Sequence, residues 1–197
     1  MQEPPLNHQI GYDISNKYIF GFWVYLMTDL IMFAVLFATF AVLRYSTFGG
    51  PGGDKLFSLP LALAETLILL TSSLTCGLAV LAAKHGRIRQ TLAWFAATFM
   101  MGSAFLGLEL NEFHHLILDG NGPQRNAFLS SFFTLVGTHG LHIAAGLLWM
   151  LIIMVFVWRR GLSPKLTNQL VRLGLFWHFL DLVWIFIFTI VYLIGVL

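Results

Sequence analysis

The chain has 197 residues, of which 58% are hydrophobic and only 10% are charged. Soluble domains carry about 25% charged residues, so this composition excludes an ordinary soluble protein and predicts an integral membrane protein. The net charge of +2 is too small to indicate nucleic-acid binding, and the single cysteine, Cys76, excludes an internal disulfide or a multi-cysteine metal site.

Five apolar runs are long enough to cross a bilayer, which takes about 20 helical residues. We place them at residues 19–43, 59–83, 90–113, 131–158 and 171–196. Glycines and prolines at 49–53 and at 121–123 separate successive runs, because such segments cannot continue a helix. We therefore expect an all-α fold, a five-helix transmembrane bundle. Residues 1–18 would form an N-terminal segment and residues 19–197 a single membrane domain.

Basic residues are distributed unequally over the two ends of these spans. One side, which includes the N-terminal segment, carries Lys17, Lys84, Arg87, Arg89, Arg159, Arg160, Lys165 and Arg172. The opposite side carries only Arg44, Lys55 and Arg125. Cytoplasmic loops are enriched in Lys and Arg. The asymmetry therefore predicts a cytoplasmic N-terminus and a periplasmic C-terminus.

Ionisable side chains inside the predicted spans are candidate functional or structural sites, because a charge at the bilayer centre costs at least about 2.5–3.5 kcal/mol. At a rise of about 1.5 Å per residue, Asp29 and Asp181 lie near the midplane. His178 lies in the inner half of the fifth span. The side chains in the outer part of the membrane are Glu65, Glu109, Glu112, His139 and His142.

The most unusual segment reads Trp177-His178-Phe179-Leu180-Asp181-Leu182-Val183-Trp184. Residues three or four apart share a helix face, so His178 and Asp181 can pair with each other or with one shared partner. Trp177, Asp181 and Trp184 form a stripe on one face. We interpret this stripe as an interface that anchors the fifth helix, rather than as a lipid-facing surface.

The histidines raise the hypothesis of a haem-bearing membrane anchor of a respiratory dehydrogenase. Axial ligands must approach one iron from opposite faces, but His139 and His142 lie three apart on one helix. The depth of His178 differs from that of His139 by about 10–20 Å at the helical rise. The geometry of a bis-histidine site is therefore poor, and the haem anchor is retained only as the alternative function.

A metal site is the second alternative chemistry. It would require Glu109, Glu112, His115 and His139 to converge at the outer membrane edge, next to His114. Di-iron carboxylate sites use two Glu-x-x-His elements, whereas this chain has one. A small transporter is also conceivable, but no internal repeat is present. We expect no catalytic, cofactor-binding or metal-binding residue in this chain.

Asp29 has no basic residue within its own span, so any partner must come from another helix. Two interpretations remain open. Asp29 is either a structural group that bonds to a neighbouring helix, or a group that takes part in proton movement or modulates it beside a proton entrance. Acidic and histidine side chains do not form a continuous row from one side of the predicted membrane to the other. A complete proton channel in this chain is therefore not expected.

Two segments carry a resemblance to a known family. They are Gly137-Thr138-His139-Gly140-Leu141-His142 and the segment from Trp177 to Trp184. With Asp29 in the first span and Glu112 near the end of the third, they make the chain resemble subunit III of the haem–copper oxidases from about Lys17 onward. Within this family the chain is most similar to the cytochrome bo-type ubiquinol oxidases. The similarity lies in the number of spans, which is five, and in the residues at 21–23 and 111–116.

This resemblance implies a non-redox subunit of a proton-translocating terminal quinol oxidase in the bacterial inner membrane. Haem and copper would reside in partner subunits, and this chain would bind only phospholipid. Its partners would be the catalytic subunit I, subunit II and a small subunit IV. The resemblance also implies that Asp29 corresponds to an intramembrane carboxylate, often a glutamate, that is linked to proton uptake.

Overall fold

The computed structural model describes the backbone of residues 6–47 and 59–194, and the side chains from residue 20 onward within these ranges. It contains helices α1 (Leu6–Leu43), α3 (Leu59–Lys84), α4 (Ile88–Leu118), α5 (Ala127–Arg160) and α6 (Pro164–Ile187), followed by the π-helix η1 (Phe188–Leu193). Five segments of these helices are long and apolar enough to cross a membrane. The predicted all-α fold with five spans is confirmed.

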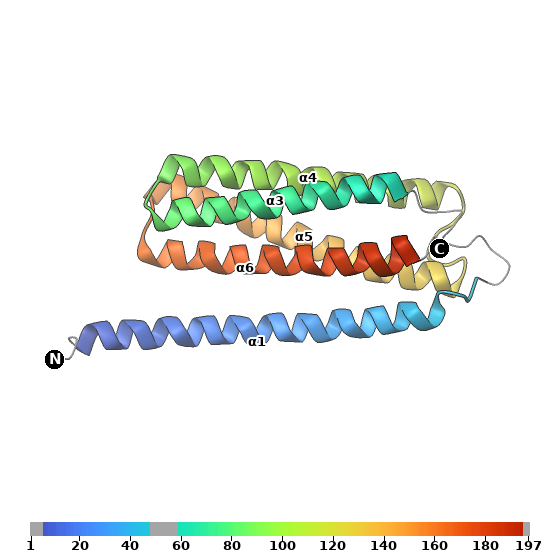
Figure 1. Ribbon diagram of the computed structural model, residues 1–197, viewed down its shortest axis with the longest axis horizontal. Helices are drawn as coiled ribbons and strands as arrows, with labels where there is room; N and C mark the ends of the chain where they lie inside the picture. The colour runs from blue at the N-terminus through green and yellow to red at the C-terminus, as the bar shows by residue number, and fades with distance from the viewer. Residues whose placement is uncertain (1–5, 48–58, 195–197) are drawn as a thin grey trace.

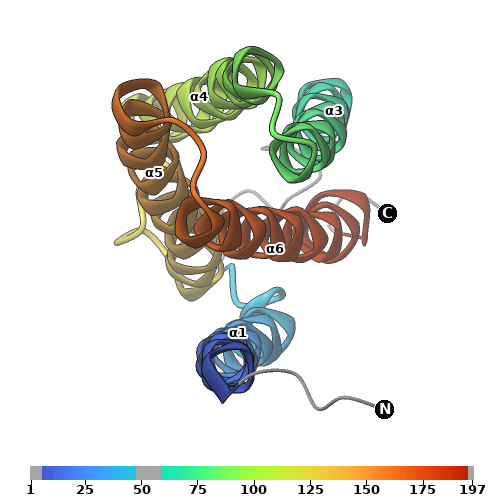
Figure 2. The ribbon, with the colours of Figure 1, turned by 90° about the vertical axis from the view of Figure 1, so that its left-hand side faces the viewer.

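The helices run along a common long axis (Figure 1). Helices α3, α4, α5 and α6 form one group, and α1 lies outside this group beside α6 and α5 (Figure 2). Within the group, α3 contacts α4 and α6, and α5 contacts α4 and α6. The turns between α3 and α4 and between α5 and α6 lie at the end that faces the viewer in Figure 2.

All five helices begin or end beyond the bounds predicted from hydropathy, and α4, α5 and α6 do so at polar ends. Helix α6 starts at Pro164 rather than at residue 171, because the Ser163 hydroxyl accepts a hydrogen bond from the Leu166 amide (3.3 Å) and proline suits the first turn. Helix α5 starts at Ala127, where the Asn126 side chain accepts from the Leu129 amide (2.8 Å). Helix α4 continues to Leu118. The starts of α5 and α6 are therefore stabilised by side-chain caps, which an average of hydropathy does not detect.

The N-terminal segment predicted at residues 1–18 is helical from Leu6 onward and continuous with the first span. Residues 1–5 of that segment lie outside the described residues. The candidate membrane span within α1 begins at Phe20. Helix α1 is therefore longer than its membrane-crossing part.

Helix α1 is buried along one narrow stripe. The stripe contains Leu26, Asp29, Phe33 and Phe40, with the partly buried Leu36 between them. These positions follow one another at spacings of three and four residues, which places them on one face of the helix. The stripe packs on α5 and α6, and from residue 20 onward the remaining faces of α1 are largely exposed.

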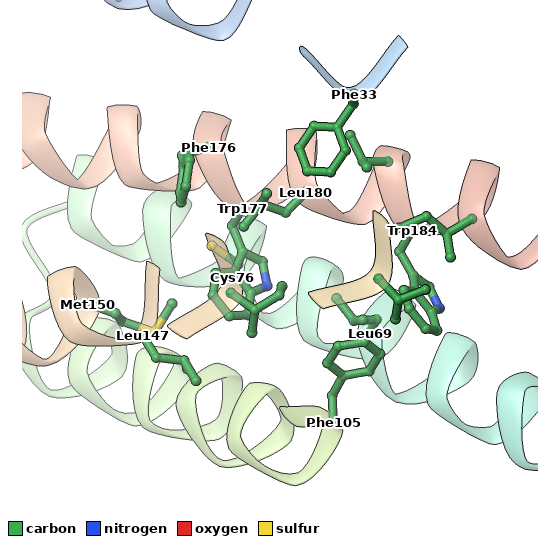
Figure 3. Close-up of a cluster of buried hydrophobic side chains, with 14 of the residues drawn as sticks. Phe33, Leu69, Cys76, Phe105, Leu147, Met150, Phe176, Trp177, Leu180 and Trp184 are labelled. Carbon is green, nitrogen blue, oxygen red and sulfur yellow. The ribbon is translucent and has the colours of Figure 1, made fainter. Parts of the chain in front are cut away.

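The core of the four-helix group is built around two indoles of α6. Trp177 and Trp184 are 0% exposed, and both lie in the interior cluster of Figure 3. Gly102 of α4 provides space for Trp177, because a Cβ at Gly102 would lie only 2.7 Å from the indole Cη2. Gly146 of α5 lies on the same indole, with its virtual Cβ 3.2 Å from Cζ3. Small residues therefore allow three helices to approach each other closely.

Candidate functional site: polar clusters in the helix bundle

Hydroxyl groups of α3 bind both core indoles of α6. The Nε1–H of Trp177 donates to Ser72 Oγ (3.0 Å), and the Nε1–H of Trp184 donates to Thr66 Oγ1 (3.1 Å). A buried indole needs an acceptor for its single N–H. These two bonds provide the acceptors and determine how α6 lies along α3.

The two ionisable residues of the Trp177–Trp184 segment also face α3. Ser73 Oγ is 2.6 Å from His178 Nδ1, and Asp181, which is 6% exposed, interacts electrostatically with both Ser73 and His178. A Cβ at Gly77 would lie 3.9 Å from His178 Nε2, which shows how closely the imidazole approaches the α3 backbone. The structure thus brings His178 and Asp181 together around one shared residue of α3.

The stripe of Trp177, Asp181 and Trp184 is an interface within the chain. Its partners are Ser72, Ser73 and Thr66, all on α3. Because the indoles are completely buried, they are not available to another subunit. The hydroxyl groups were not singled out from the sequence, although Ser and Thr inside an apolar span commonly bond across helices.

Three carboxyl groups form a second cluster where α3, α4 and η1 meet. Glu65 is 0% exposed and Glu109 is 2% exposed, and both interact electrostatically with Glu112. Glu112 Oε2 accepts a hydrogen bond from the hydroxyl of Tyr192 (2.9 Å). None of the four carboxyl oxygens of Glu65 and Glu109 has a hydrogen-bond partner within the described part of the chain.

The members of the carboxyl cluster contact two different elements. Glu112 bonds to Tyr192 of η1. Glu109 packs against the α5 backbone instead, since a Cβ at Gly140 would lie 2.9 Å from Glu109 Oε1. Tyr192 was missed because one tyrosine at the end of an apolar span is an ordinary membrane-interface residue.

His139 of α5 is enclosed by aromatic rings. Its imidazole stacks on Trp184 with ring centroids 5.3 Å apart, and its centroid is 6.0 Å from that of Phe105 in an edge arrangement. Neither ring nitrogen has a hydrogen-bond partner within the described residues. His114 and His115, in contrast, are exposed at the end of α4. In the described ranges no three His, Cys, Asp or Glu residues are arranged to hold a metal ion.

Asp29 of α1 meets His142 of α5. Asp29 Oδ2 is 3.9 Å from His142 Nε2, and His142 Nδ1–H donates to the Thr138 carbonyl (2.7 Å). This backbone bond orients the imidazole so that Nε2 points to the carboxylate. Asp29 is 9% exposed and belongs to the buried stripe of α1. The described part of α1 supplies Tyr25 as a hydrogen-bonding neighbour of Asp29, and α5 supplies the imidazole of His142.

Comparison with known proteins adds an independent observation. The model of the family described as cytochrome c oxidase subunit III matches residues 6–196. The cytochrome bo(3) ubiquinol oxidase subunit 3 of Pseudomonas aeruginosa is 56% identical over 97% of this chain and 91% of the relative. The quinol oxidase subunit 3 of Bacillus subtilis is 44% identical over 90% of this chain and 87% of the relative.

A relative with a different electron donor in its name is as similar to this chain as the Bacillus subtilis protein. The cytochrome c oxidase subunit 3 of Bacillus sp. PS3 is 44% identical over 92% of this chain and 87% of the relative. The match spans the whole helical bundle, including α1 and the segment from Trp177 to Trp184. The chain belongs to the cytochrome c oxidase subunit III family.

Proposed function

We propose that this chain is the non-redox third subunit of a terminal quinol oxidase in the bacterial inner membrane. The complex would oxidise quinol, reduce oxygen to water and translocate protons. The observation that carries the proposal is the match over 97% of the chain, at 56% identity, to a protein named ubiquinol oxidase subunit 3. The subunit would contribute no catalytic residue, and haem and copper would be bound by its partners.

The proposed role is to support the catalytic subunit I, together with subunit II and a small subunit IV, and to bind phospholipid. The α3–α6 contact supports this role, because a helix pair bonded through four polar side chains and two buried indoles can present a constant surface to a partner. His178 and Asp181 would lock α6 in place. The N-terminus would be cytoplasmic, as the distribution of Lys and Arg favours.

The test of this function is the purification of the affinity-tagged full-length chain in a mild detergent. We expect haem–copper subunits to co-purify, identified by mass spectrometry, with haem absorption that follows those subunits and not this chain. A Soret band at one haem per isolated chain, lost on His139→Ala, would instead support the haem-bearing dehydrogenase anchor. The enclosure of His139 by Trp184 and Phe105 argues against that alternative.

Asp29 would modulate proton uptake by the complex. Its position supports this proposal, because the carboxylate lies within the membrane span of α1 and meets the imidazole of His142. We expect Asp29→Asn to lower proton-coupled turnover of the assembled oxidase by a factor of two or more, about 0.4 kcal/mol in activation free energy. The measurement is oxygen consumption with proton release in vesicles.

The matched control is Asp119→Asn, at an exposed residue after α4. Equal turnover in both variants and the wild type would contradict the role of Asp29.

A further inference from the structure

A cavity of about 200 Å³ lies between α3 and α4 at the end where a short turn joins them. The turn is tight, and Gly86 adopts φ +71°, a conformation that favours glycine. Two kinds of side chain line the cavity, apolar and polar. The lining residues are Leu78, Leu81, Ala82, His85, Arg87, Gln90 and Trp94.

The two kinds of lining residue are separated along the helices. Leu78, Leu81 and Trp94 lie on the side of the membrane span, and Leu81 and Trp94 are exposed there. His85 and Arg87 lie at the helix ends and are also exposed. An apolar wall next to a cationic end matches a ligand that has an acyl chain and an anionic headgroup. Tryptophan is enriched at this level of a membrane, where headgroups lie.

The polar groups of the cavity retain unused hydrogen-bond capacity. His85 Nδ1–H donates to the Leu81 carbonyl (2.9 Å), which leaves Nε2 directed away from the backbone. Arg87 uses one guanidinium nitrogen for Gln90 Oε1 (3.3 Å). Since a guanidinium has five N–H donors, most of its donors remain for a ligand.

No carboxylate neutralises this end of the four-helix group within the described side chains. The acidic residues of α3, α4 and α6 are Glu65, Glu109, Glu112 and Asp181, all far along their helices from the turn. The single ion pair found among the described residues joins Asp29 and His142. Among the described side chains Arg87 therefore has no carboxylate as a partner, and Lys84 and Arg89 add positive charge beside it.

We propose that this α3–α4 cavity binds the phosphate of an anionic phospholipid. Arg87 and His85 contact the headgroup, and Leu78, Leu81 and Trp94 contact the first part of an acyl chain. Basic pockets between transmembrane helices are a known means of binding anionic headgroups on the cytoplasmic side. The exposed apolar wall favours a lipid over free phosphate. The inference rests on the phospholipid binding proposed above and names one site for it.

The experiment uses the purified oxidase complex with the full-length chain. Native mass spectrometry follows the retention of phosphatidylglycerol during titration, with phosphatidylcholine as the zwitterionic comparison and inorganic phosphate as a competitor. We expect Arg87→Gln to weaken phosphatidylglycerol binding about fivefold, the factor for one cation lost beside an anionic headgroup. The matched control is Arg89→Gln, which removes the same charge from the same turn but does not line the cavity. We expect Arg89→Gln to retain most of the phosphatidylglycerol binding.

Several outcomes would overturn the site. They are unchanged retention in Arg87→Gln, equal loss in Arg87→Gln and Arg89→Gln, equal binding of phosphatidylcholine, or displacement of the lipid by inorganic phosphate. If Arg87→Gln prevents assembly, His85→Gln and Trp94→Leu are measured with the same expectation. Failure of the proposed function is separate, because then the wild-type chain does not co-purify with haem–copper subunits.

Discussion

Gly102 illustrates how one residue determines the packing of three helices. It has no side chain at the point where the Trp177 indole of α6 contacts α4, and Leu147 of α5 lies 3.0 Å from the same virtual Cβ. The ring is completely buried and its N–H is bonded to Ser72, so it cannot move aside without losing a hydrogen bond. The sequence indicates only that Gly102 is small, and the indole that requires this smallness is identified by the structure.

We therefore expect Gly102→Ala to destabilise the subunit by about 1–3 kcal/mol, the usual cost of overpacking a core. The control is Gly107→Ala on the same helix, where no atom lies within 4 Å of the new Cβ. Because alanine favours a helix over glycine by roughly 0.5–1 kcal/mol, this control should be neutral or slightly stabilising. Unfolding of the detergent-solubilised protein with increasing dodecyl sulfate measures both. Similar midpoints for the two variants would refute the role of Gly102.

At the scale of elements, α3 links its neighbours through hydroxyl groups. Thr66, Ser72 and Ser73 bond to α6, and Thr75 Oγ1 lies 2.8 Å from Thr98 Oγ1 of α4. In a membrane, the apolar surfaces of helices gain little by leaving lipid, so close packing and interhelical hydrogen bonds hold them together. Helix α3 is suited to this because small hydroxyl side chains permit close approach and also supply acceptors.

A double-mutant cycle tests the contact between α3 and α6. Thr66→Val preserves the shape of the side chain, and Trp184→Phe removes the indole N–H, so the cycle isolates their hydrogen bond. We expect a coupling free energy of about 0.6–1.7 kcal/mol, the range for interhelical hydrogen bonds in membranes. The same cycle with Thr134→Val, an exposed threonine of α5, serves as control and should give no coupling. Additive effects of Thr66→Val and Trp184→Phe would disprove the contact.

At the scale of the whole molecule, the five helices divide into a tightly bonded group and one peripheral helix. Helix α1 is held by one stripe in which Asp29 is the polar member, and its remaining apolar surface is available to lipid or to other subunits. The two ends of the bundle also differ. One end carries the basic residues of the α3–α4 and α5–α6 turns, and the other carries the carboxyl cluster and Asp119.

This difference between the ends predicts the orientation in the membrane, which cysteine labelling can measure. Gln124→Cys lies in the α4–α5 connection and Lys165→Cys in the first turn of α6, and both positions are exposed. With a membrane-impermeant maleimide, we expect Gln124→Cys to react from the periplasmic side and Lys165→Cys only after the membrane is opened. The native Cys76 is 0% exposed and gives the background. The reverse pattern would invert the proposed topology.

The number of spans and the identity of their polar residues follow from local sequence. Hydropathy depends only on neighbouring residues, so the five runs and the ionisable groups within them could be recognised without a structure. Helix ends were placed less well, because Ser163 and Asn126 extend α6 and α5 through caps in polar segments. The stripe from Trp177 to Trp184 follows from residue spacing alone, since residues three or four apart share a helix face, and its role as an anchor stays a prediction.

The partners of these polar groups depended on the tertiary structure. A carboxylate in an apolar run must find a partner, but the sequence does not reveal how each helix is rotated or shifted against its neighbours. Packing sets both, which is why Asp29 meets His142, Glu112 meets Tyr192, and the indoles of α6 meet hydroxyl groups of α3. The sequence by itself thus determined the class of protein, the spans and the residues that need partners. Only the tertiary structure decided which partners these are, because helix contacts join residues that are distant in sequence.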